Sequence, residues 1–142
     1  MYTIVSNVTR KLYRRAPHKS AHGLVHTIYY LKTCSTCQRI IKALNLSKDF
    51  TQQDLKTTPI SASDLEVLKS LSGSFEALFS KRAKLYKEMG LKNKMLQEAD
   101  YRQYILEHYT FLKRPVLVIE DQIFVGNSPK IIAAAKLALT NA

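Results

Sequence analysis

The chain has two cysteines, Cys34 and Cys37, and both lie at the junction between a predicted strand and a predicted helix. A run of β-branched, aromatic and aliphatic side chains over residues 27–31 predicts a buried strand. Apolar side chains that recur at helical spacing after Cys37 predict a helix over residues 35–44. The Cys-x-x-Cys motif therefore occupies the loop in which the strand passes into the helix.

The expected position of Cys34 favours a reactive thiolate. Ser35 or Thr36 is expected to cap the helix, which places Cys34 just before its first turn. The free N–H groups and the positive end of the helix there stabilise a thiolate over a thiol. Because Cys37 follows three residues later, it lies within reach of Cys34 for a disulfide. We predict redox or nucleophilic chemistry, with Cys34 as the nucleophile.

Two other interpretations of the cysteine pair remain open. Both cysteines could be ordinary buried residues that never react. They could also form half of a zinc site, but no second cysteine pair exists, and His22, His26 and His108 lack the spacing of zinc-finger ligands. We therefore expect no metal site.

Composition limits the remaining possibilities. A length of 142 residues with 46% hydrophobic content suits one folded domain with a core of its own. No apolar run approaches the roughly 20 residues that span a bilayer, so no membrane association is expected. The low cysteine content and the absence of a signal-peptide pattern indicate a reducing compartment, and we expect a cytoplasmic protein.

The formal net charge of +11 is interpreted as mostly solvated surface together with a basic leader. Residues 1–26 contain five basic and no acidic residues, and they show no clear apolar period. We expect them to be a disordered leader that resembles a transit peptide, although an upstream translation start or a vector-derived leader explains them equally well. A basic surface suits several anionic partners, but no nucleic-acid motif accompanies it, so direct nucleic-acid binding is not expected.

The order of the remaining elements predicts an α/β domain over residues 27–142. A strand at residues 50–55 completes a βαβ unit with the first strand and helix. Helical stretches are then expected from Ser61 or Ser63 to Gly73, over Ser74–Phe79, over Ala83–Met89 and over Glu98–Tyr109.

The last part of the chain predicts a hairpin and a final helix. Residues 115–119 and 122–125 are β-rich runs, for which an antiparallel pairing is the natural arrangement. Ser128 is a suitable N-cap and Pro129 a suitable first helical residue. The order βαβ, helical insertion, ββα is that of a thioredoxin-like fold, with a mixed four-stranded sheet flanked by helices.

Arg114 and Pro115 form a second candidate feature. In a thioredoxin-like fold the residue at the start of this strand faces the Cys-x-x-Cys loop, and a proline there is commonly cis. The alternative is a strand-starting proline that follows an ordinary exposed arginine.

With these motifs in order, the chain resembles the arsenate reductase (ArsC)/Spx family over about residues 27–137. The matching segments are Thr27-Ile28-Tyr29, Cys34-Ser35-Thr36-Cys37, Leu55-Lys56-Thr57-Thr58-Pro59, Leu85 to Leu91, Lys113 to Val116, and Val125 to Pro129. The resemblance implies a thioredoxin fold with a helical insertion and a nucleophilic cysteine at Cys34. It also implies that Arg114 holds an anion or stabilises the thiolate, beside Pro115.

The resemblance implies two different activities. In the reductases the cysteine attacks arsenate, and glutathione and glutaredoxin resolve the adduct. In the Spx regulators the same loop is a disulfide switch, and the protein binds the C-terminal domain of the RNA polymerase α subunit. Alignment on the segment from Leu85 places Ser80 where the reductases have one further arginine, with Arg82 nearby. Asn127 falls at or beside the position of another.

We expect an arsenate-reductase-like thiol oxidoreductase in which Cys34 attacks, Cys37 resolves and Arg114 lowers the pKa of Cys34. Arg82, Pro115 and Asn127 are the candidate substrate-binding residues. No bound cofactor is expected, glutathione or glutaredoxin is the expected reductant, and the protein is expected to be a monomer. The alternative is a redox-sensing regulator that binds the RNA polymerase α subunit.

Overall fold

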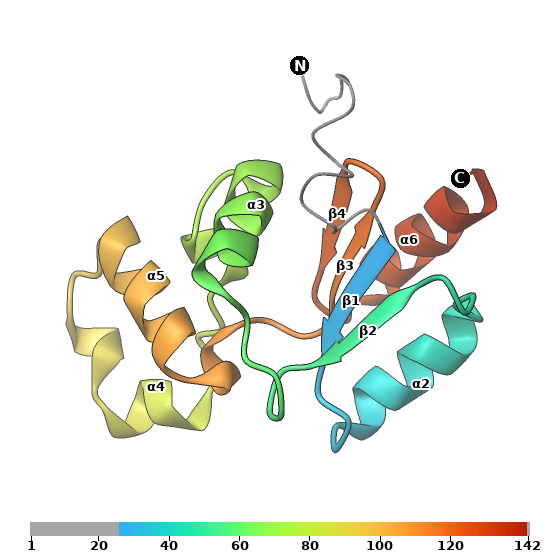
Figure 1. The fold of residues 1–142 in the computed structure, drawn as a ribbon. Coiled ribbons are helices and arrows are strands. Elements are labelled where there is room, and N and C mark those ends of the chain that lie inside the picture. Colours follow the sequence, from blue (N-terminus) through green and yellow to red (C-terminus); the bar gives the residue numbers. More distant parts are fainter. Residues whose placement is uncertain (1–25, 142) are drawn as a thin grey trace.

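The computed structural model describes residues 26–141, which form a four-stranded sheet with helices on both faces (Figure 1). The leader predicted over residues 1–26 lies outside the described residues except for His26, which is the first residue of β1. The elements are β1 His26–Tyr30, α2 Ser35–Leu44, β2 Thr51–Asp54, α3 Ala62–Ser72, η1 Glu76–Leu78, α4 Lys84–Glu88, η2 Leu91–Asn93, α5 Glu98–Glu107, η3 Tyr109–Phe111, β3 Val116–Ile119, β4 Gln122–Val125 and α6 Pro129–Asn141.

The strands are arranged in the order β2-β1-β3-β4. β1 runs parallel to β2 and antiparallel to β3, and β3 pairs antiparallel with β4. The mixed sheet and the C-terminal hairpin agree with the sequence-based expectations. None of the helices within residues 26–141 is both long and apolar enough to span a membrane.

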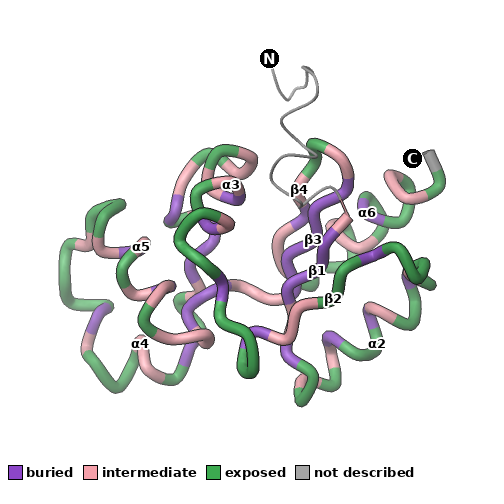
Figure 2. The backbone as a smooth tube through the Cα atoms, in the orientation of Figure 1, coloured by how far each residue is buried: buried purple, intermediate pink, exposed green. Residues whose placement is uncertain are grey.

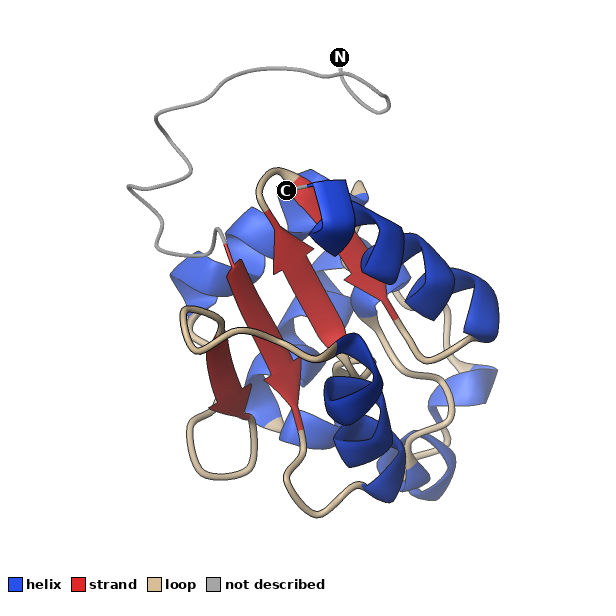
Figure 3. Cartoon of the chain, turned by 90° about the vertical axis from the view of Figure 1, so that its right-hand side faces the viewer, coloured by secondary structure: helices blue, strands red, loops and turns tan. Residues whose placement is uncertain are grey.

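Alternating side chains of the central strands fill two separate cores. Ile28 and Leu117 point toward α2 and α6, where they pack with Ile40 and Ala135. Figure 3 shows these two helices covering one face of the sheet. The two central strands β1 and β3 are buried on both faces, which explains why they read as nearly continuous apolar runs in the sequence.

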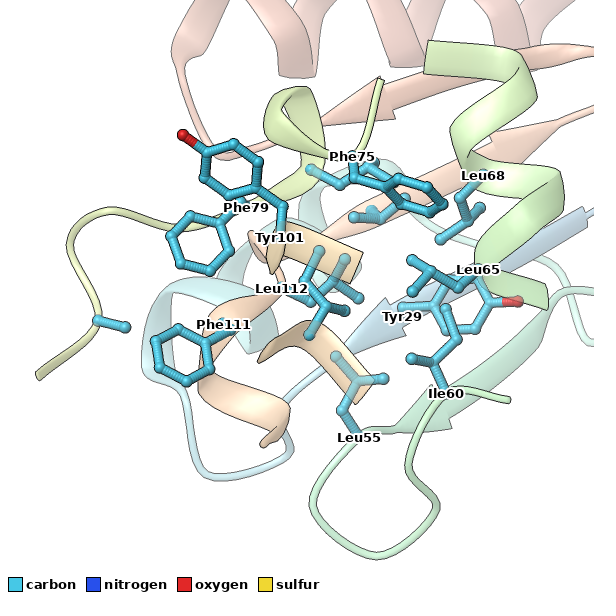
Figure 4. Packing of buried hydrophobic residues seen from close by; sticks show 14 of the residues in the cluster. Tyr29, Leu55, Ile60, Leu65, Leu68, Phe75, Phe79, Tyr101, Phe111 and Leu112 are labelled. Atoms are coloured by element: carbon cyan, nitrogen blue, oxygen red, sulfur yellow. The ribbon is translucent and has the colours of Figure 1, made fainter. Parts of the chain in front are cut away.

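The second core lies between the opposite face of the sheet and the helical insertion α3 to α5. Tyr29 and Val118 of the sheet pack there with Leu65 and Leu68 of α3. Figure 4 shows this cluster, in which the aromatic side chains come mainly from the insertion. In Figure 2 buried and exposed residues alternate along the insertion, and Lys84, Lys87 and Glu88 of α4 are exposed.

Several helix boundaries are set by local signals that the sequence contains. The Ser61 side chain caps α3 by accepting a hydrogen bond from the Asp64 backbone N–H at 3.1 Å. Gly73 ends α3 with a φ of 100°, a left-handed conformation in which a Cβ is disfavoured. Ser128 precedes α6 and accepts from the Ile131 N–H at 3.2 Å. These boundaries confirm the predictions for α3 and α6.

The helix predicted over Ser74–Phe79 is wrong in part, because only the 3₁₀ turn η1 forms and Phe79 is extended. Its neighbours make backbone hydrogen bonds to a distant segment: the Ser80 N–H donates to the Phe111 carbonyl at 2.7 Å, and the Lys113 N–H donates to the Leu78 carbonyl at 2.8 Å. These bonds draw the Phe79 ring into the core beside Phe111 (Figure 4). Long-range pairing therefore overrides local helix preference here.

Other predicted elements are shorter in the structure. The strand expected at residues 50–55 forms only over β2, and α4 is shorter by one residue at each end than predicted. The helix predicted over Glu98–Tyr109 ends at Glu107. His108 is extended, and its Nδ1 accepts a hydrogen bond from the Thr110 N–H at 3.2 Å, which begins η3.

Candidate functional site

Cys34 lies at the end of the loop after β1 and is itself the N-cap residue of α2. The expectation that Ser35 or Thr36 caps the helix is therefore wrong, because Ser35 is already the first helical residue. The Cys34 N–H donates to the Leu31 carbonyl at 3.0 Å, and its own carbonyl accepts from the Gln38 N–H at 3.1 Å. These bonds fix the backbone of Cys34 while its side chain stays partly exposed.

The surroundings of Cys34 favour its thiolate. Partial burial raises the pKa of Cys34. Four other contributions lower this pKa and together outweigh the effect of burial: they come from the Cys37 backbone N–H, the Cys37 thiol, the Thr36 backbone N–H and the charge of Arg114. The net result is a pKa below the ordinary value of a cysteine. The Cys34 side chain makes no capping hydrogen bond, but the positive end of α2 favours a negative charge on the sulfur.

Cys37 has the opposite character. Its side chain is fully buried, and burial raises the pKa of the Cys37 thiol to about 11. The hydrogen bond with Cys34 and the charge of the Cys34 thiolate raise it as well, while the Leu31 backbone and Arg114 lower it. The two sulfur atoms thus differ strongly in acidity, although they belong to one turn of chain. The thiol of Cys37 is arranged to donate toward Cys34.

Arg114 is the charged residue that acts on both cysteines. It precedes Pro115 through a cis peptide bond, as expected for a proline at this place in a thioredoxin-like fold. Its Nη1 donates to the Thr110 carbonyl at 3.2 Å and to the Leu112 carbonyl at 3.4 Å. Its Nε is buried and has no hydrogen-bond partner among the described residues. The guanidinium is therefore held by the backbone and retains free donors.

The structure places the other candidate residues differently. Pro115 begins the segment into β3, and its carbonyl accepts from the Gly126 N–H at 2.9 Å, so the turn that contains Asn127 lies beside it. The Asn127 side chain is exposed in that turn and makes no hydrogen bond within residues 26–141. Arg82 is exposed in the turn before α4 and forms no hydrogen bond or ion pair with any described residue.

Two residues that the sequence analysis missed hold the cysteine loop in place. One Asp54 carboxylate oxygen accepts from the Lys32 N–H at 3.2 Å and from the Lys56 N–H at 3.3 Å. The Gln38 side-chain amide donates to the Lys32 carbonyl at 2.8 Å. Asp54 could have been found from the sequence, because it ends the predicted second strand and the ends of the parallel strands β1 and β2 lie side by side.

In the described part of the chain, no group of three or more His, Cys, Asp or Glu side chains is placed to hold a metal ion. The chemistry that this site offers is that of a thiolate supported by a second thiol and a guanidinium. Such a group can attack a sulfur atom or an electrophilic oxyanion.

Comparisons with known proteins relate the whole arrangement to one family. The family model described as the ArsC family matches residues 29–135, a range that begins in β1 and ends in α6. The global transcriptional regulator Spx of Bacillus subtilis is 22% identical over 102 residues, which cover 70% of this chain and 78% of the regulator.

Solved structures of similar proteins have the same fold. An arsenate reductase from Vibrio cholerae superposes with a TM-score of 0.60 at 24% identity, covering 78% of this chain and 98% of the reductase. An arsenate reductase (ArsC) related protein from Brucella melitensis gives a TM-score of 0.58 at 23% identity, covering 76% and 91% of the two chains. The predicted thioredoxin-like α/β fold is thereby confirmed.

Proposed function

Because this chain belongs to the ArsC family, we propose that it is a thiol oxidoreductase whose nucleophile is Cys34 and whose reductant is glutathione or glutaredoxin. One observation carries the proposal: Cys34 is partly exposed at the N-terminus of α2, and its pKa is lowered by the N–H groups of α2, by Cys37 and by Arg114. Only the thiolate attacks, so a lowered pKa increases the reactive fraction near neutral pH.

The first step is attack by the Cys34 thiolate on one sulfur atom of a disulfide substrate. A mixed disulfide forms between Cys34 and the substrate, and the other substrate sulfur leaves as a thiolate that takes a proton from water. Arg114 supports the anionic reactants through its charge. A substrate with carboxylate groups, such as a glutathione mixed disulfide, suits a guanidinium that still has free donors.

Cys37 performs the second step in this proposal. After losing its proton, the Cys37 sulfur attacks the Cys34 sulfur, the Cys34–Cys37 disulfide forms, and the bound half of the substrate leaves as a thiol. The substrate gains two electrons and the cysteine pair loses two. Two glutathione molecules, or reduced glutaredoxin, return them and become oxidised.

The acidity of Cys37 suits this order of events. The Cys34 thiolate is one of the groups that raise the pKa of Cys37. Once the Cys34 sulfur is bonded to substrate it carries no charge, so that contribution disappears and Cys37 ionises more easily. Cys37 therefore stays protonated until it is needed. A reducing compartment such as the cytoplasm would keep the resting pair as thiols.

Arsenate is one candidate substrate within this class. The positive charge of Arg114 acts at Cys34 and would favour an oxyanion bound there. Arg82 and Asn127, the residues nearest to the further anion-holding positions implied by the resemblance, are exposed and make no contact that would aim them at Cys34. We therefore propose the general reductase activity first and arsenate as a case to be tested.

The test measures reduction of arsenate and of a glutathione mixed disulfide side by side. The arsenate assay contains glutathione and glutaredoxin, the mixed-disulfide assay contains glutathione without glutaredoxin, and turnover above the rate without protein is followed as NADPH consumption through glutathione reductase. We expect turnover of the mixed disulfide that is lost in Cys34→Ser and only reduced in Cys37→Ser, since glutathione can replace Cys37. Turnover that persists in Cys34→Ser, or the absence of turnover with both substrates, would contradict the proposal.

A second candidate function is a redox-sensing regulator that binds the C-terminal domain of the RNA polymerase α subunit. The match to a global transcriptional regulator supports this function. Arg82 and Asn127 are exposed, which also fits a regulator, because a protein that only binds a partner does not need these side chains to hold an anion beside Cys34. In that role the Cys34–Cys37 disulfide would change a binding surface without turning over substrate.

A pull-down on the isolated α-subunit domain tests this candidate. Wild-type protein would be compared in its reduced and oxidised forms with the variant Cys34→Ser. Redox-dependent capture of the wild-type chain, together with a lack of turnover in the enzyme assays, would favour the regulator. Capture that is absent in both redox forms would exclude it.

A further inference from the structure

The positive charge of the described chain is concentrated in one short segment. Residues 81–95 contain six basic residues and one acidic residue, a net charge of +5. The other residues of the range 27–142 contain eleven basic and ten acidic residues, a net charge of +1. These six basic side chains are all exposed, so the excess positive charge of the folded domain lies on one stretch of its surface. We call residues 81–95 the basic segment.

Ion pairs neutralise only part of the basic segment. Lys81 pairs with Glu76 at 3.0 Å, and Lys84 pairs with Glu88 at 3.7 Å. Four exposed cations form no ion pair with the described residues: they are Arg82, Lys87, Lys92 and Lys94.

The acidic residues that follow the segment are engaged elsewhere. The Glu98 carboxylate accepts from the N–H groups of Phe75 and Glu76, and the Asp100 carboxylate accepts from the Gln97 N–H at 2.7 Å. Both carboxylates are thus occupied by hydrogen bonds from backbone N–H groups and do not pair with the basic segment. The four cations are therefore left to solvent or to a partner.

The basic segment also exposes apolar side chains. Within the described residues the large exposed hydrophobic side chains are Met89, Met95 and Leu137, and two of the three belong to this segment. Met95 is 91% exposed and Met89 is 43% exposed. Methionine is flexible and polarisable, and it is frequent on surfaces that bind partner proteins.

These side chains are displayed on an ordered scaffold. Ala83 and Leu91 are buried in the core, and they anchor the segment before α4 and at η2. Gly90 has a φ of 66°, which lets the chain turn sharply between α4 and η2. Figure 1 shows this part of the helical insertion on the side away from α2 and α6, and most of its residues are exposed (Figure 2).

We propose that the basic segment is a docking surface for an acidic protein partner that carries apolar side chains among its carboxylates. The four unpaired cations attract and orient such a partner, because complementary charge raises association rates and fixes register. Met89 and Met95 supply the apolar contact area. This function is independent of the chemistry at Cys34.

A nucleic acid fits the basic segment less well. Phosphate contacts would use the cations but leave the two exposed methionines facing water. The only aromatic side chain in the segment, Tyr86, is half-buried against the core and offers no stacking platform. α4 has five residues and η2 has three, too short to lie along a major groove as a recognition helix.

The experiment measures binding of two synthetic 16-residue peptides to the full chain by NMR titration. One peptide has leucine at helical spacing (i, i+3, i+4, i+7) and glutamate at positions between the leucines. The other has the same glutamates, with serine in place of each leucine. A 16-base-pair DNA duplex is the third probe. The first peptide should bind the most tightly and should shift the backbone signals of the basic segment.

Matched variants assign the binding to the segment. The segment variant combines Arg82→Gln, Lys87→Gln, Lys92→Gln and Lys94→Gln, and the control variant combines Lys42→Gln, Lys48→Gln, Lys130→Gln and Lys136→Gln at four other exposed lysines. The segment variant should lose about tenfold in affinity for the leucine peptide, and the control less than about twofold, since four weak exposed ion pairs are lost together only in the segment variant.

Further variants test the apolar part and the independence from the cysteines. The double variant Met89→Gln/Met95→Gln should bind the leucine peptide about threefold more weakly and the serine peptide with unchanged affinity. Cys34→Ser should bind both peptides as the wild type does. Equal weakening by the segment and control variants, equal affinity for the two peptides, or tighter binding of the duplex than of the leucine peptide would each overturn the proposal.

Discussion

The Asp54 carboxylate accepts a hydrogen bond from the backbone N–H of Lys32 at 3.2 Å. This contact joins the loop that carries Cys34 to the end of the neighbouring strand β2. The same carboxylate oxygen also accepts from the Lys56 N–H, so one side chain ties two loops together. The position of the Cys34 sulfur relative to α2 and Arg114 thus depends on a residue that does not touch it.

Replacing Asp54 should change the reactivity of Cys34. In Asp54→Ala both loops lose their shared acceptor, so the helix N–H groups and Arg114 are held less firmly around the sulfur. We expect the Cys34 pKa to rise toward its ordinary value, and the protein to lose about 1–3 kcal/mol of stability. The measurement is the rate of Cys34 alkylation as a function of pH.

Two controls separate positioning by Asp54 from general destabilisation. Asp54→Asn keeps a side-chain acceptor and should restore much of the wild-type alkylation profile. Asp121→Ala removes an exposed carboxylate from the β3–β4 turn and should leave the profile unchanged. An Asp54→Ala protein whose profile matched the wild type would show that the carboxylate only stabilises the fold.

Cys34 should be alkylated before Cys37. The pKa of Cys34 is lowered, whereas that of the buried Cys37 is raised to about 11. A thiolate fraction grows as pH rises through the pKa, so Cys34 becomes reactive at lower pH than a free cysteine, whose pKa is ~8.5, and Cys37 only at higher pH. Peptide mapping after brief iodoacetamide treatment at neutral pH checks this order. Faster labelling of Cys37 would reverse the assignment.

Mild oxidation should join Cys34 and Cys37 within one molecule. The two thiols interact directly, and the spacing permits disulfide geometry at the start of a helix. Mass spectrometry should show a loss of about two hydrogens, reversed by dithiothreitol. Cys37→Ser serves as the control and should give only mixed or intermolecular disulfides. Free thiols that persist in the wild type under the same oxidant would assign Cys37 a structural role.

Arg114→Ala should raise the pKa of Cys34, because the positive charge of Arg114 favours the thiolate. Alkylation of Cys34 near neutral pH should slow by about two- to tenfold. The free energy of unfolding should fall by only ~1 kcal/mol, because two hydrogen bonds to backbone carbonyls are lost. The rate of Cys34 alkylation, measured at several pH values, gives this pKa.

Arg114→Lys separates charge from geometry. Lysine keeps the positive charge but lacks the planar fork of donors, so it should recover part of the pKa effect and less of any oxyanion turnover. If Arg114→Ala left the alkylation profile unchanged, Arg114 would be an ordinary partly exposed residue.

Phe79→Ala should destabilise the fold by about 3–5 kcal/mol, because a nearly fully buried aromatic side chain is removed from the core. Its ring contacts Tyr86, Tyr101, Tyr104 and Phe111, which join several parts of the helical insertion. Urea unfolding followed by circular dichroism measures the loss. Leu137→Ala, at a 64% exposed position, should change the stability by less than about 0.5 kcal/mol.

Features that depend on neighbouring residues could be predicted from the sequence. Alternating and helical apolar patterns predicted the strands and most helices, because each element must bury one face or both. Ser61 and Gly73 marked the ends of α3 since capping and left-handed backbone are local requirements. The Cys-x-x-Cys loop was identified in the same way, as a motif between two adjacent elements.

Contacts between groups that are distant in the sequence could be identified only in the folded chain. Phe79 is extended rather than helical because the chain around it pairs with the segment at Leu112, more than 30 residues away. Arg114 acts on the cysteines while Arg82 stays exposed, although the sequence made both arginines candidate site residues. Asp54 reaches the cysteine loop because β1 and β2 are parallel neighbours. Such contacts depend on sheet order and helix packing, which no local pattern of residues specifies.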